Sequence, residues 1–226
     1  MESNKYALYP KTWEQQQEEC IMSTTVKSRI NVRTLAFVGM LAAIIFVMAF
    51  TPLGYLKTGG LSITFLMVPV ALGAVLFGPG AGAFLGGVFG LTSFIQCFGL
   101  EPFGTTLMGI NPIFTVLTCL VPRILTGLLV GYIFRALQKI DKTRLLSYAG
   151  ACLSGSLLNT LLFMTCLVLF FWNTDFIQGM SAGANVFAFV IAFVGINGLV
   201  EAISCFVIGT VLAKTLSVLG RMIAKK

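Results

Sequence analysis

Long apolar runs separated by short polar segments dominate this chain. Six such runs lie at residues 32–50, 62–77, 80–98, 111–137, 145–172 and 186–213. About 20 predominantly apolar residues in a helix span the hydrocarbon core of a bilayer. The pattern therefore predicts an all-α integral membrane protein with six transmembrane helices.

Prolines and glycines divide these runs. Gly78-Pro79-Gly80 predicts a tight turn between the second and third helices. The second helix is short, and Pro69 inside it predicts a kink. Residues 51–61 and 173–185 are expected to be outer loops.

Polar segments flank the apolar region. Residues 1–29 predict a cytosolic polar tail, residues 30–214 a six-helix membrane domain, and residues 215–226 a basic cytosolic tail. Met22 precedes an ordinary short lead-in to the first apolar run. Translation from Met22 is therefore a hypothesis alongside translation from Met1.

Composition and charge support a membrane location. Of 226 residues, 57% are hydrophobic and 10% charged, against about 25% charged in soluble domains, and the mean hydropathy is +0.94. With the N-terminus inside, the inner segments carry 13 lysines and arginines, and the outer loops carry only Lys57. The positive-inside rule then predicts a multi-pass cell membrane protein with both termini cytoplasmic. The formal charge of +7 has this origin, so it does not indicate nucleic-acid binding.

Two helices carry small residues along one face. Gly82, Gly86 and Gly90 recur every four residues on the third helix, where they permit close helix packing. Ala36, Gly39 and Ala43 form a similar face on the first helix. The spacing alone leaves open whether the glycine stripe has a role beyond packing.

Arg123 and Glu201 are the two charged residues that lie well away from the ends of the apolar runs, at similar estimated depths of about 18 and 20 Å above the inner boundary. A charge at mid-membrane costs at least about 2.5–3.5 kcal/mol on insertion scales, so such residues are paired or functional. One interpretation is an internal ion pair. The other is that Arg123 holds a substrate anion, a task that suits a guanidinium.

Several uncharged polar residues share this region. The amides are Gln96, Asn111, Asn159 and Asn197. Each amide alone is explained by a hydrogen bond to a neighbouring helix, but together they suggest a polar cavity that opens outward. Tyr55 is either a residue of the interfacial aromatic belt or part of a lid over that cavity.

No metal, cofactor or catalytic set is expected. The chain has no histidine, and its six cysteines form no CxxC motif. An intramembrane enzyme would need a nucleophile with a base, or a metal centre, and neither can be assembled. A self-sufficient secondary transporter remains an alternative, although no inverted repeat is evident.

Two stretches carry a family resemblance. The runs TFLMVPVALGAVLFGPGAGAFLGGVFGLTSF and NPIFTVLTCLVPRILTGLLVG resemble the substrate-binding S component of energy-coupling factor (ECF) vitamin transporters. The resemblance covers about residues 32–213. It implies a six-helix fold and a vitamin site in the outer half of the membrane, covered by the loop between the first two helices.

The resemblance also implies partners and a ligand. These are a membrane-embedded T component, two ATPase subunits and a water-soluble vitamin. Small residues of the first helix contact the T component in the family, and the matching step here is Gly39-xxx-Ala43. Pro122-Arg123-Ile124-Leu125 after an Asn-Pro start is most like pantothenate-type members, with riboflavin-type and other vitamin-specific members as alternatives.

Overall fold

The computed structural model describes residues 32–51, 54–58, 61–139, 145–181, 185–186, 188–191, 198, 201–203, 205–211 and 215. Contacts divide the chain into two compact units, Met1–Ala36 and Phe37–Lys226. The described part of the first unit is the opening of a helix at residues 32–36. The second unit contains the remaining described elements.

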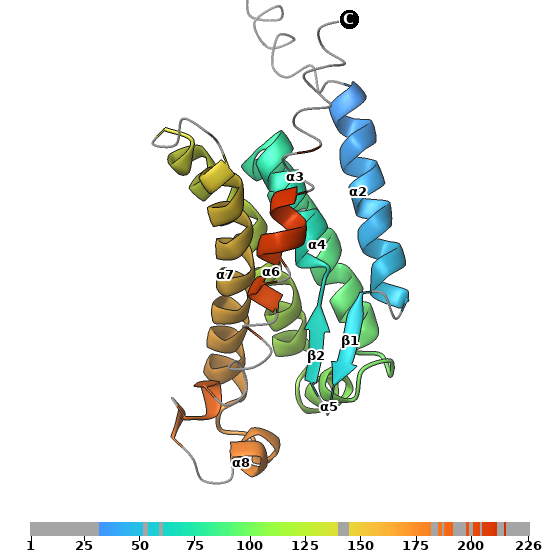
Figure 1. The fold of residues 1–226 in the computed structure, drawn as a ribbon. Helices are drawn as coiled ribbons and strands as arrows, with labels where there is room; N and C mark the ends of the chain where they lie inside the picture. The colour runs from blue at the N-terminus through green and yellow to red at the C-terminus, as the bar shows by residue number, and fades with distance from the viewer. Residues whose placement is uncertain are drawn as a thin grey trace, which may run out of the picture. The chain divides into compact units, whose positions relative to one another are not determined.

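Helices make up most of the described chain (Figure 1). In chain order they are α2 (Val32–Phe50), α3 (Met67–Phe77), α4 (Pro79–Gln96), α5 (Pro102–Ile110), α6 (Pro112–Leu137), α7 (Leu145–Phe171) and α8 (Asp175–Ser181). Residues 188–191, 201–203 and 205–211, in the predicted sixth helix, are also helical. Positions 187, 192–197, 199–200, 204 and 212–213 of the predicted helix lie outside the described residues.

A β-hairpin joins α2 to α3, so the all-α prediction is wrong at this point. Strands β1 (Tyr55–Thr58) and β2 (Leu61–Thr64) pair antiparallel, with Tyr55 opposite Thr64 and Thr58 opposite Leu61. The pairing satisfies backbone groups that a loop would leave to water. The sequence does contain a signal for it, because the two residues between the strands are Gly59 and Gly60.

The hairpin moves the start of the second predicted helix from residue 62 to Met67. Pro69 therefore lies in the first turn of α3 rather than in its interior. Amides of the first turn have no intrahelical acceptor, so the proline breaks no helical hydrogen bond there. The kink predicted at Pro69 has no cause in this arrangement.

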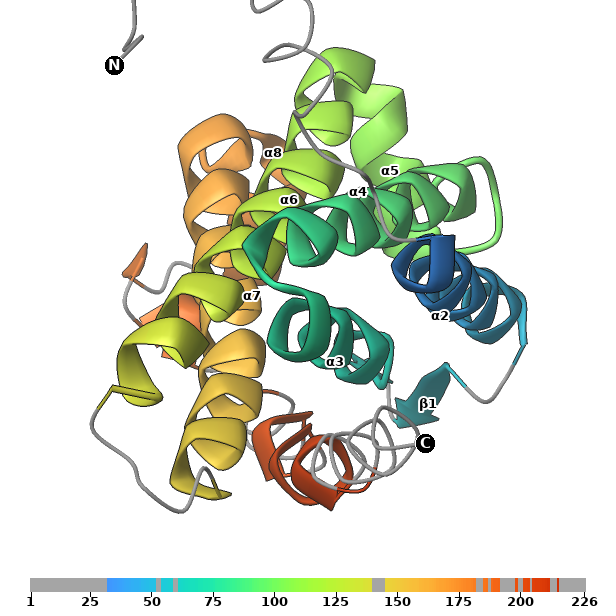
Figure 2. The ribbon, with the colours of Figure 1, turned by 90° about the horizontal axis from the view of Figure 1, so that it is seen from above.

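Helix α3 lies at the centre of the second unit. Seen from above, it is placed between α2, α4, α6 and α7 (Figure 2). All nine residues from Met67 to Val75 are buried, as expected for a helix that is apolar on every side. They form a core with Ile45 of α2, Leu85 and Phe89 of α4, and Val130 of α6.

Two described helices are long and apolar enough to cross a membrane, at Pro112–Leu137 and Ser147–Phe171. Both agree closely with the predicted fourth and fifth helices. Two further helices are short. Helix α8 lies within residues 173–185, which were expected to be an outer loop, and α5 lies in the segment between the third and fourth apolar runs. Both begin where a cap or proline favours a helix start, with Pro102 at the first position of α5 and Asp175 in the first turn of α8.

Candidate substrate site around Arg123

Helices α4 and α6 pack along a seam of small residues that we call the glycine seam. Its α4 side is Pro79, Gly82, Gly86 and Gly90, and its α6 side is Gly131, Gly127, Arg123 and Cys119. Both sets recur at about four-residue intervals, so each forms one stripe along its helix. A methyl group on Gly82 or Gly86 would collide with the backbone of α6. The seam therefore holds the backbone of Arg123 directly against α4.

Pro122 changes the hydrogen bonding of α6 beside Arg123. A proline has no amide hydrogen, so the carbonyl of residue i−4, here Thr118, loses its usual helical donor. The Nη1 atom of Arg123 donates to this carbonyl oxygen at 2.9 Å. Helix α6 continues through Pro122 without a break. Pro122 and Arg123 thus act together, and the guanidinium is turned back along its own helix.

Two aromatic rings flank the guanidinium. Its central carbon lies 5.2 Å from the ring centroid of Phe89 on α4 and 4.9 Å from that of Phe163 on α7. Rings at these distances stabilise a cation through their π faces. The buried Nε atom has no hydrogen-bond partner. Because the guanidinium is positioned by one carbonyl and two rings, it retains donors for an anion.

A second polar group lies near Arg123. The carboxyl of Glu201 is buried beside the side chains of Thr64, Ser156 and Asn159, and it interacts electrostatically with Arg123. Across the described residues, no ion pair within 4.0 Å joins Glu201 to Arg123. Glu201 Oε1, Ser156 Oγ, Asn159 Oδ1 and Thr64 Oγ1 are all buried without a partner of hydrogen-bonding geometry. These four side chains are the Glu201 cluster.

Other predicted site residues have structural partners. Gln96 is buried and donates through Nε2 to the carbonyl of Ala49, which joins α4 to the end of α2. Asn111 caps α6, since its Oδ1 accepts from the amides of Ile113 and Phe114 at 3.1 and 3.3 Å. Tyr55 is the first residue of β1. Asn197 lies outside the described residues.

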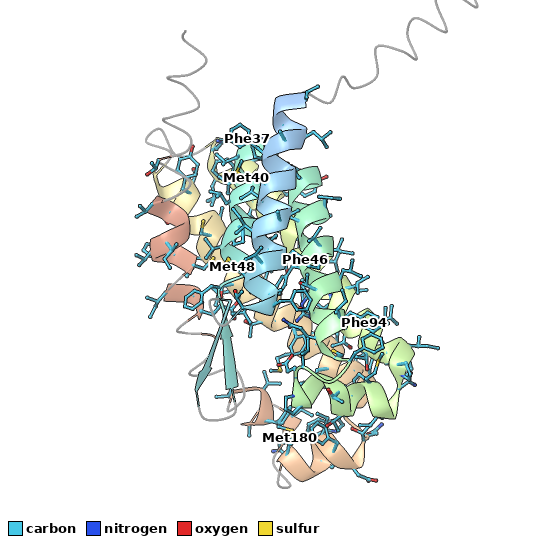
Figure 3. All side chains as sticks on the ribbon, turned by 90° about the vertical axis from the view of Figure 1, so that its right-hand side faces the viewer. Phe37, Met40, Phe46, Met48, Phe94 and Met180 are labelled. Carbon is cyan, nitrogen blue, oxygen red and sulfur yellow. The ribbon has the colours of Figure 1, made fainter. Side chains whose placement is uncertain are left out.

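The small residues of the first helix lie on an uncovered face of α2. Gly39 and Ala43 are exposed, and a methyl group added to Gly39 would meet nothing within 4 Å. Ala36, in the opening residues of the helix, is exposed as well. Figure 3 looks onto α2, along which Phe37, Met40 and Phe46 are exposed too.

Sequence reasoning missed several residues that surround Arg123 and Glu201. Thr118, Phe89 and Phe163 position the guanidinium, and Thr64 and Ser156 belong to the Glu201 cluster. Apolar residues such as Phe89 carry no signal in a chain this rich in phenylalanine. Pro122 was a usable signal, because a proline at this position leaves the carbonyl of Thr118 without its helical hydrogen-bond donor. No three His, Cys, Asp or Glu side chains in the described part of the chain converge as metal ligands.

Comparison with known proteins decides the family. Residues 33–213 match the family described as "ECF transporter, substrate-specific component". The chain belongs to that family. Its members are transporter components rather than enzymes, and the predicted resemblance is confirmed.

Two curated relatives of this ECF component are named for pantothenate. Pantothenic acid transporter PanT of Lactococcus lactis subsp. cremoris (strain MG1363) is 29% identical over 169 residues, or 68% of this chain and 77% of that protein. Pantothenate transporter PanT of Leuconostoc mesenteroides subsp. mesenteroides is 36% identical over 97 residues, or 41% of this chain and 46% of that protein. This chain is therefore similar to both over part of its length.

Proposed function

We propose that this ECF component binds pantothenate in an outward-facing cavity and delivers it for uptake. The observation that carries the proposal is the environment of Arg123: a half-buried guanidinium without an ion-pair partner in the described chain. Pantothenate bears one carboxylate, and a guanidinium binds carboxylates through parallel charge-assisted hydrogen bonds. The names of the two relatives support this choice of vitamin.

We propose a membrane topology of six helices with both termini cytoplasmic. The 13 lysines and arginines of the inner segments, against Lys57 outside, support this orientation. Arg123 lies twelve residues before Arg135, which is in the last turn of α6 and on the inner side in this topology. At about 1.5 Å per residue this spacing supports a position of the guanidinium in the outer half of the membrane.

We further propose that the chain works with a T component and two ATPase subunits. Family membership supports this partnership. The exposed small face of α2 at Ala36, Gly39 and Ala43 offers a surface that another membrane helix can approach closely.

The test is to purify the chain in lipid nanodiscs and titrate it with pantothenate and, separately, with riboflavin. We expect saturable pantothenate binding and no uptake when the chain alone is placed in vesicles. Binding of riboflavin in place of pantothenate would assign the chain to another vitamin. Accumulation of pantothenate by the chain alone would instead identify a self-sufficient secondary transporter.

A further inference from the structure

We propose that the Glu201 cluster is a hydroxyl-recognition subsite, so that the ligand carries a carboxylate at one end and hydroxyl groups at the other. This inference rests on the proposed function and specifies how the ligand lies. Arg123 binds the ligand carboxylate. The ligand hydroxyls donate hydrogen bonds to the cluster, which consists of Thr64, Ser156, Asn159 and Glu201.

The cluster is assembled from three separate segments. Thr64 ends strand β2, Ser156 and Asn159 lie on α7 one turn apart, and Glu201 lies in the helical stretch 201–203. Ser156 is fully buried, and Asn159 and Glu201 are 7% and 8% exposed. Polar side chains from three segments therefore converge below the surface, and a small-molecule site likewise depends on a few convergent polar groups.

The cluster has unused hydrogen-bonding capacity. Thr64, Ser156 and Asn159 lie close enough to the Glu201 carboxyl to stabilise its charged form as hydrogen-bond donors do. Even so, one polar atom in each of the four side chains has no partner at good hydrogen-bonding distance and angle. More than nine in ten buried polar groups in proteins are hydrogen-bonded, and an unmade bond is costly. A ligand that supplies the missing partners therefore gains affinity from this region.

The types of unpartnered atom identify the ligand chemistry. Glu201 Oε1 and Asn159 Oδ1 are acceptors, and the hydroxyls of Thr64 and Ser156 accept as well as donate. The complementary ligand group is thus a hydrogen-bond donor. A second carboxylate on the ligand is disfavoured at this end of the site, because its oxygens would lie against the acceptor oxygens of the Glu201 carboxyl. A hydroxyl group is such a donor. Arg123 therefore selects the carboxylate end of a small hydroxy acid, and the Glu201 cluster selects its hydroxyl end.

The electrostatic interaction between Arg123 and Glu201 supports a single site. The two charges interact electrostatically, yet they do not come within 4.0 Å of each other. Arg123 is directed instead to Thr118 O and the rings of Phe89 and Phe163. In the proposed arrangement, a ligand held at both ends would connect the Arg123 side chain to the Glu201 cluster.

The experiment compares pantothenate with N-(3,3-dimethylbutanoyl)-β-alanine, which keeps the carboxylate and the amide but lacks both hydroxyls. Affinities are measured by calorimetry for the whole chain in nanodiscs. We expect wild type to bind pantothenate at least tenfold tighter than the analogue. Ser156→Ala is expected to weaken pantothenate binding, leave the analogue unchanged and so reduce the preference.

Ser154→Ala is the matched control. Ser154 lies two residues earlier on α7, and its hydroxyl donates to Ala151 O at 2.9 Å within the same helix. This variant is expected to keep the full preference. Thr64→Val tests the same subsite from the hairpin, so the inference stays open to refutation even when Ser156→Ala does not fold.

The outcomes separate the two proposals. Equal wild-type affinity for both compounds refutes the hydroxyl subsite, while pantothenate binding itself upholds the proposed function. An unchanged preference in both Ser156→Ala and Thr64→Val also refutes the subsite. Binding of neither compound by wild type refutes pantothenate as the ligand, and the subsite with it.

Discussion

Gly86 of α4 lies directly against the backbone of Arg123 of α6. A methyl group on Gly86 would collide with the carbonyl oxygen of Arg123 and also approach Cα of Ile124 to 3.3 Å. The glycine seam and the candidate substrate site therefore share a residue. Close packing of two helices fixes the backbone from which the guanidinium extends, and the side chain of Arg123 is then set by Thr118 O and two aromatic rings.

Gly86→Ala is expected to lower the free energy of unfolding by about 1–3 kcal/mol, and with it the melting temperature, because the added methyl overpacks a backbone contact. Gly87→Ala is the matched control. A methyl there would meet Ile124 Cγ1 at 3.7 Å, an ordinary van der Waals distance. Differential scanning fluorimetry of the two variants in the same detergent measures the contrast. Equal melting temperatures would show that α4 and α6 are not packed along this seam.

Arg123→Ala is expected to weaken pantothenate binding at least tenfold, since a lost charge-assisted hydrogen bond costs about 1.5–3 kcal/mol. The variant also leaves Thr118 O without its donor, so its folding must be checked by thermal melting. The double variant Arg123→Met with Glu201→Leu removes both charges and is expected to fold. A folded double variant that binds pantothenate like wild type would refute a direct role for Arg123.

Gly39→Leu and Ala43→Leu are expected to weaken assembly with the T component and leave vitamin binding intact. Both positions are exposed on α2, and added bulk prevents close approach of a partner helix. Co-purification of the co-expressed complex measures assembly. Gly109→Leu on α5 serves as the control, because this glycine is also exposed with nothing within 4 Å. Full assembly of both α2 variants would place the T component elsewhere.

Cys97 and Cys119 are expected to form a disulfide under mild oxidation. Their sulfur atoms lie 3.8 Å apart at the end of the glycine seam, and a disulfide needs about 2.05 Å. Diamide treatment followed by peptide mass spectrometry should find this link, which closes a loop and raises the melting temperature. Cys119→Ser should abolish it. A link from Cys97 to Cys166 of α7 in place of Cys119 would contradict the packing of α4 on α6.

Sequence patterns predicted the long helices well, because a helix in lipid must be apolar and about 20 residues long whatever it packs against. The bounds of α6 and α7 follow from Asn111-Pro112 and from the apolar run after Leu145. The hairpin was missed because its strands of four residues are short and its pairing is a contact between segments. Gly59-Gly60 was the local signal for it.

In the candidate site, too, some features were visible in the sequence and others depended on contacts between separate segments. A charge in an apolar run is visible in the sequence, so Arg123 and Glu201 were identified without the fold. The roles of polar side chains depend on which backbone groups reach them. Gln96 binds Ala49 O and Asn111 caps its own helix, and these uses could not be told from substrate contacts by residue type.

The sequence by itself determined the membrane class, the family and the two charged residues within apolar runs, because hydrophobicity, spacing and charge are properties of the chain alone. The tertiary structure decided which groups are partners. It directed Arg123 to the carbonyl freed by Pro122, kept it beyond 4.0 Å from Glu201, and brought Thr64 and Ser156 beside that carboxyl. Hydrogen bonds require atoms within about 3 Å in the right direction, and no linear pattern encodes that proximity between segments far apart in the chain.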